Sequence, residues 1–119
     1  MASLVRKALE AAQFAGSSPK GRYWAFRHPN QDAPPQTYRL ARRAGNGWTL
    51  LLAASKATGQ VLSFYVESDE DQQAVREALQ WLGIRGEIVP GEEVTLRLAS
   101  GASIPSQLVG GEKPKKKGA

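Results

Sequence analysis

The stretch "TYRLARRAGNGWTLLLAASKATGQVLSFYVE", from Thr37 to Glu67, decides the fold of this chain of 119 residues. It contains three runs of the residue types that favour extended backbone, separated by two short turns that contain glycine. The runs cover residues 37–44, 48–55 and 60–67, and the turns are "GNG" at 45–47 and "KATG" at 56–59. This spacing predicts three consecutive antiparallel strands.

The residues before this stretch predict a further strand and a helix. Residues 22–28 are rich in aromatic side chains, which favour strands, and Pro29 ends the run. Ser3 is a suitable N-cap for a helix over residues 4–15, and Gly16 is placed to end it. Leu4, Val5, Ala8, Leu9 and Ala12 form the apolar stripe of that helix.

The residues after it predict a second helix over 69–82. Ser68 and Asp71 fit a capping box, three acidic residues follow the cap, and Gly83 is placed to stop the helix. Its expected buried residues are Val75, Ala78, Leu79 and Leu82.

Weaker strand patterns follow at 87–89 and 93–98. The predicted fold class is therefore α+β: a four-stranded antiparallel meander with an N-terminal helix and a second helix packed on one face, followed by one or two further strands. We expect residues 1–109 to form a single domain and residues 110–119 to be a disordered basic tail.

Composition narrows the function classes. There is no cysteine, which excludes disulfides and thiolate chemistry, and no apolar run approaches the length of a membrane span. Charged residues interrupt the N-terminal apolar residues, so we expect no secretory signal and a cytoplasmic protein without membrane contact.

The net charge of +5 is unevenly distributed. Residues 1–66 carry nine lysines and arginines against two acids, whereas residues 67–112 carry three arginines against nine acids. Four lysines lie in the tail. This asymmetry indicates a basic surface for an anionic partner and an acidic element elsewhere.

Strand alternation predicts which residues lie on each face of the sheet. We expect the helix-covered face to bury Trp24, Phe26, Leu40, Leu62 and Phe64, and the open face to carry Tyr23, Arg27, Arg39, Arg43 and Tyr65. Residues 48–55 are apolar on both faces. A central strand, a covered outer face or a dimer in which two sheets meet would each explain that pattern.

The predicted function is non-enzymatic binding of single-stranded DNA or RNA through the basic and aromatic open face. Arginines contact phosphates and stack on bases, and tyrosines stack on bases. The candidate binding residues are Arg22, Tyr23, Arg27, Arg39, Arg42, Arg43, Lys56 and Tyr65. The alternative for these side chains is a solvated sheet face on which arginine stems cover apolar neighbours.

No catalytic or cofactor motif is present. His28 is the only histidine, and the glycine-containing loops lack the pattern of a phosphate-binding loop. The sequence therefore predicts no enzyme activity, no metal and no cofactor. The second function class is a protein-interaction module, a homodimer or a small regulator of the phage or plasmid type that binds a larger protein through the acidic helix. The residues considered for that contact are Glu70, Gln73, Glu77 and Trp81.

Overall fold

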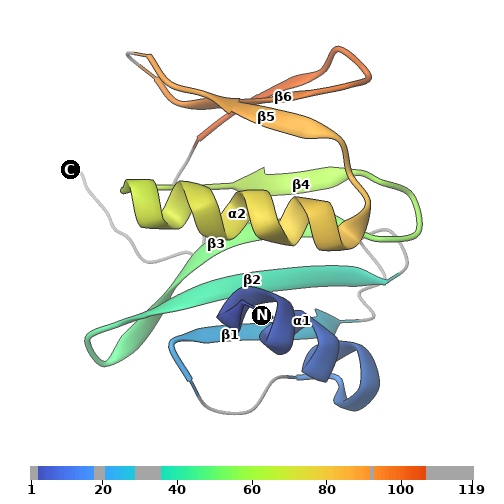
Figure 1. The fold of residues 1–119 in the computed structure, drawn as a ribbon, viewed down its shortest axis with the longest axis vertical. Helices are drawn as coiled ribbons and strands as arrows, with labels where there is room; N and C mark the ends of the chain where they lie inside the picture. The colour runs from blue at the N-terminus through green and yellow to red at the C-terminus, as the bar shows by residue number, and fades with distance from the viewer. Residues whose placement is uncertain (1–2, 18–20, 29–35, 92, 107–119) are drawn as a thin grey trace, which may run out of the picture.

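The computed structural model describes residues 3–17, 21–28, 36–91 and 93–106. These residues form two helices and seven strands, which confirms the α+β class with an N-terminal helix (Figure 1). The elements are α1 (Leu4–Ala15), β1 (Tyr23–His28), β2 (Thr37–Ala44), β3 (Gly47–Ser55), β4 (Val61–Phe64), α2 (Asp69–Leu82), β5 (Gly86–Val89), β6 (Thr95–Leu98) and β7 (Ser103–Pro105).

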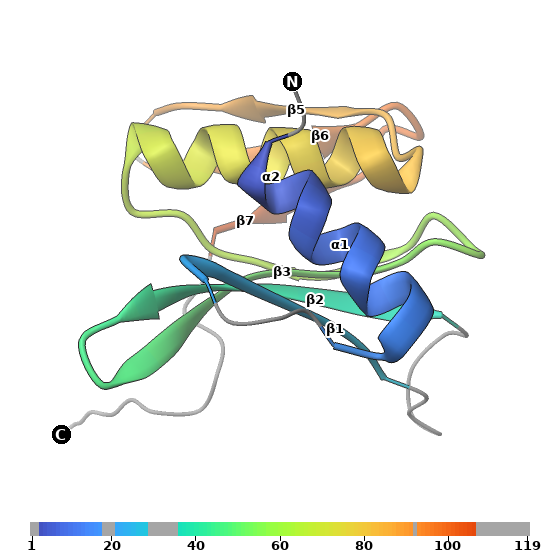
Figure 2. The same ribbon diagram turned by 60° about the horizontal axis from the view of Figure 1, so that its bottom comes forward.

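The strands form two antiparallel sheets. The first has the order β1-β2-β3-β4, as the predicted meander requires, and the second has the order β5-β6-β7. Both helices lie on the same side of the first sheet, and α2 lies between the two sheets (Figure 2). A contiguous buried cluster joins both helices with both sheets, and it includes Leu9, Phe64, Val75, Ile88 and Leu96.

Both helices begin and end at the predicted residues. The Ser68 hydroxyl accepts a hydrogen bond from the Asp71 backbone N–H at 3.2 Å, and the Asp71 carboxylate accepts one from the Glu67 N–H at 3.1 Å. At the other end Gly83 has φ +77°, a left-handed conformation that glycine adopts without steric cost. The predicted inward stripe of α2 is buried.

A β-bulge explains why β3 is apolar on both faces. β3 is a central strand between β2 and β4, and the register shifts between Leu40 and Ala41. Leu40 pairs with Leu52 and Ala41 pairs with Leu50, so Leu51 has no partner on β2. Leu51 and Leu52 are consequently both buried in the core.

The predicted faces of β1 are wrong. Tyr23 and Ala25 are buried in the core, whereas Trp24 and Phe26 are half-buried on the opposite face. The physical reason is the helix, because α1 packs directly against β1 and the small Ala25 permits its close approach. Side-chain size had favoured the two larger aromatics for the core.

On β4 a second register shift lies between Ala53 and Ala54, opposite Val61 and Ser63. Val61 is buried as a result, and Leu62, which we expected in the core, is half-buried. Leu40 and Phe64 are buried as predicted.

The C-terminal part differs most from the prediction. β5 and β6 lie where the weaker strand patterns predicted strands, whereas β7 was not predicted, and these three strands form a sheet of their own. The predicted tail at 110–119 lies outside the described residues. In the described part of the chain no helix is long and apolar enough to cross a membrane.

Candidate functional site

The side of the first sheet that faces away from both helices is the candidate site, and we call it the outer face (Figure 2). Directly paired residues of antiparallel strands share a face, so the register assigns its members. They are Trp24, Phe26, Arg39, Ala41, Arg43, Trp48, Leu50, Ala53 and Ser63, together with the buried Thr37 and Ser55. Among the described residues, no helix or strand covers this face.

Three aromatic rings form the centre of the outer face. The ring centroids of Trp24 and Phe26 are 4.7 Å apart, and those of Trp24 and Trp48 are 5.3 Å apart. The interplanar angles are 33° and 48°, so the rings form a curved apolar surface and do not stack in parallel. All three are half-buried, which leaves part of each ring accessible.

Two arginines lie against these rings. The Arg39 guanidinium carbon is 5.9 Å from the centroid of Phe26, and that of Arg43 is 4.8 Å from the centroid of Trp48. Both are cation–π contacts. Neither arginine pairs with an acidic side chain in the described part of the chain. The outer face therefore presents aromatic surface together with two positive charges that no described acid neutralises.

Two other predicted residues of the open face lie on the helix side of β1. Tyr23 is 7% exposed, and desolvation by this burial is the main reason that its pKa is raised. Arg27 pairs across the strands with the buried Tyr38 and is exposed at the sheet edge. Neither side chain is placed to act together with Arg39 and Arg43.

Arg22, Arg42 and Lys56 make contacts away from the outer face. Arg22 forms a 2.6 Å ion pair with Glu70, and this hydrogen bond is the main reason that the pKa of Arg22 is raised. The Lys56 ammonium lies 4.2 Å from the centroid of the Trp81 ring. Trp81 packs edge-on against Tyr38, so it is part of the core boundary.

Arg42 lies in a partly buried ion-pair network. Its Nε is 2.6 Å from Asp71 Oδ1, and its Nη2 is 3.1 Å from Glu67 Oε1. The hydrogen bond to Asp71 is the main reason that the pKa of Arg42 is raised. The pKa of Tyr65 is raised, first by burial and then by a hydrogen bond to Glu67, which belongs to this network. The acids at the start of α2 thus engage part of the predicted basic set.

Of the eight predicted residues, the register brings Arg39 and Arg43 together on the outer face. The prediction missed Trp24, Phe26 and Trp48. A signal for the first two was present in the sequence: Ala25 lies between them, and a small residue flanked by aromatics suits the side of a strand on which a helix packs.

The described residues contain no group of three His, Cys, Asp or Glu side chains arranged to hold a metal ion. In comparisons with known protein families, with curated proteins and with solved structures, no match was found for this chain.

Proposed function

We propose that this chain binds single-stranded nucleic acid, DNA or RNA, through the outer face. The observation that carries the proposal is the presence of Trp24, Phe26 and Trp48 beside Arg39 and Arg43 on one face of the sheet. No helix or strand among the described residues covers that face. Binding of this kind requires no catalysis and no cofactor.

The chemistry follows from the two kinds of side chain. Unpaired bases expose flat faces that stack on aromatic rings, at about 1–3 kcal/mol per base. In a duplex those faces are already stacked, so the rings favour single strands. When Arg39 or Arg43 moves away from the aromatic ring that it contacts, a base can stack on that ring. The guanidinium group can then contact a phosphate.

The number of free charges sets the expected salt dependence. Each phosphate contact on a single strand contributes about −0.7 to the slope of log K against log salt concentration. Contacts from Arg39 and Arg43 alone therefore predict a slope of about −1.4. Stacking dominates the affinity under this proposal, and the salt dependence is shallow.

The test is a fluorescence-anisotropy titration of labelled single-stranded DNA and RNA across a salt series. Trp48→Ala should weaken binding about fivefold or more, because one stacked base is lost. Arg43→Glu should weaken binding and flatten the salt slope. Arg27→Glu is the matched control, because it makes the same charge change on the helix side of β1 and should leave binding unchanged.

Absence of binding at low salt would refute the proposal. An equal loss with Arg27→Glu would show that net charge, and not the outer face, controls the affinity. Binding that is lost only after removal of residues 113–119 would assign the activity to the basic tail.

Contact with another protein through the same face is the second candidate. The aromatic rings and Leu50 form an apolar surface of the kind that marks protein contacts. One such contact would be a homodimer in which the outer faces of two sheets meet. Sedimentation velocity distinguishes the two candidates. A dimer that dissociates on Trp24→Glu, without any affinity for oligonucleotides, would favour this one.

A further inference from the structure

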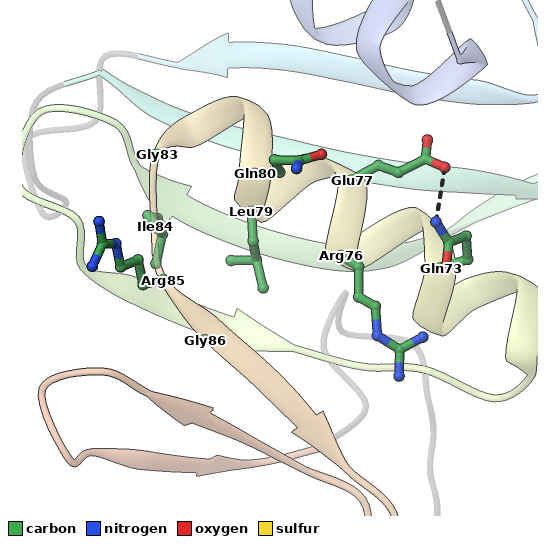
Figure 3. Close-up of a pocket in the computed structure, with 9 residues that line it drawn as sticks. All are labelled: Gln73, Arg76, Glu77, Leu79, Gln80, Gly83, Ile84, Arg85 and Gly86. Carbon is green, nitrogen blue, oxygen red and sulfur yellow. Dashed lines mark hydrogen bonds between the residues drawn. The ribbon is translucent and has the colours of Figure 1, made fainter.

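A groove lies between α2 and the start of β5, away from the outer face. It has a volume of about 780 Å³, and its walls come from residues 73–80 of α2 and residues 83–86. The helix and the strand diverge from Gly83, and Gly86 is the residue of β5 that lines the groove (Figure 3). Residues of β6 and β7 do not line it, which places it on the side of β5 that has no neighbouring strand.

The hydrogen-bond pattern identifies the free backbone groups of this edge. The Ala99 N–H donates to the Arg85 carbonyl, so Arg85 faces β6. Alternation along an antiparallel ladder then directs Glu87 and Val89 to β6 as well. The N–H and C=O groups of Gly86 and Ile88 consequently point away from β6, toward the unpaired side.

The side chains of the groove indicate what charge an occupant must carry. Gln73 donates to Glu77 at 3.1 Å, which leaves the Glu77 carboxylate charged, and Gln80 accepts from Arg6 at 2.7 Å. Arg76 and Arg85 also line the groove, both are exposed, and neither forms an ion pair with any residue that the structure describes. The lining therefore carries two positive charges and one negative charge. Figure 3 shows the Arg76 side chain extending from α2 toward the side of the groove on which β5 lies.

We propose that this groove binds an extended acidic peptide segment of a partner protein. The segment pairs as an additional strand with the backbone groups of Gly86, which is exposed and lines the groove, and continues along β5 to those of Ile88, which is 5% exposed. One of its carboxylates contacts Arg76. A second copy of β5 fits less well, because antiparallel pairing centred on Ile88 would place Gly86 opposite Pro90, which has no N–H. The surface is separate from the outer face, so this proposal does not depend on nucleic-acid binding.

The test uses a short capped peptide of alternating valine and glutamate, titrated into the ¹⁵N-labelled full chain. The amide hydrogens of Gly86 and Ile88 should exchange at least tenfold more slowly in the complex, while that of Glu87, which already faces β6, should not change. Arg76→Glu should weaken the affinity about fivefold, the upper range for one exposed ion pair. Lys7→Glu, the same charge change at an exposed position of α1, should have no effect.

Changes to the peptide separate strand pairing from attraction of charge alone. A version that is N-methylated on alternate residues lacks the ladder donors and should not bind. A peptide in which lysine replaces every glutamate should also not bind, because Arg76 repels its positive charges. Equal binding of the N-methylated peptide, or unchanged exchange at Gly86 and Ile88, would overturn the proposal. An oligonucleotide could also displace the peptide and slow exchange at the same two amides. That result would assign the groove to nucleic acid and overturn the proposal as well.

Discussion

Replacing Arg42 with methionine should destabilise the protein strongly, although Arg42 lies near the surface. The Asp71 side chain is 0% exposed and that of Arg42 is 17% exposed. Arg42→Met keeps the apolar stem but leaves the buried carboxylate with the Glu67 N–H as its remaining described partner. Loss of one member of a buried ion pair costs about 3–5 kcal/mol, and the retained hydrogen bond places this case near 3 kcal/mol.

That loss is a large part of a total stability of about 5–15 kcal/mol. With a urea m-value of about 1.5 kcal/mol/M, the unfolding midpoint should fall by about 2 M. Chemical denaturation followed by far-UV circular dichroism measures it. Combining Arg42→Met with the isosteric Asp71→Asn should recover most of the loss, because no charge is then buried.

The control is Arg22→Met, which breaks the exposed Arg22–Glu70 pair, whose side chains are 49% and 53% exposed. Its midpoint should not change measurably, since water solvates both charges after the change. If Arg42→Met and Arg22→Met had the same unfolding midpoint, the argument that burial makes the Arg42–Asp71 pair important would be refuted.

Three further predictions concern the fold. Burial raises the pKa of Tyr23. The stability that neutral Tyr23 contributes is therefore complete below about pH 10, and it is lost as the pH rises through the folded-state pKa. Tyr23→Phe should reduce the fall of the urea midpoint at alkaline pH. Gly83→Ala should cost about 1 kcal/mol, because alanine is strained at φ +77°, and the melting temperature should fall by several degrees. Ala25→Leu should cost about 1–3 kcal/mol in calorimetry, since Ala25 is 0% exposed and α1 packs on its strand.

Local signals predicted the helices and the meander. Ser68, Gly83 and the glycine-containing turns act through hydrogen bonds and backbone conformations within a few residues, so the sequence around each of them contains the necessary information. The strand β7 has three residues and pairs only with β6, and no comparable local signal marks it.

The candidate site was predicted in part for a related reason. Alternation along β2 correctly placed Arg39 and Arg43 together, because that strand pairs with β1 without a register shift. The face of β1 depends on α1, which comes from another part of the chain and packs against β1. Ion pairs between α2 and the strands decide the positions of Arg22 and Arg42, and strand alternation carries no information about such pairs.

The bulge at Leu51 has a consequence for how this chain tolerates change. If β3 paired with β2 without the bulge, strict alternation from Leu52 would send Leu50 and Trp48 inward and Thr49 outward. With the bulge in place, substitutions at Trp48 and Leu50 alter the outer face without changing the core, and the reverse holds for Leu51 and Leu52. One strand can therefore acquire a new surface chemistry by point mutation while its hydrophobic half is preserved.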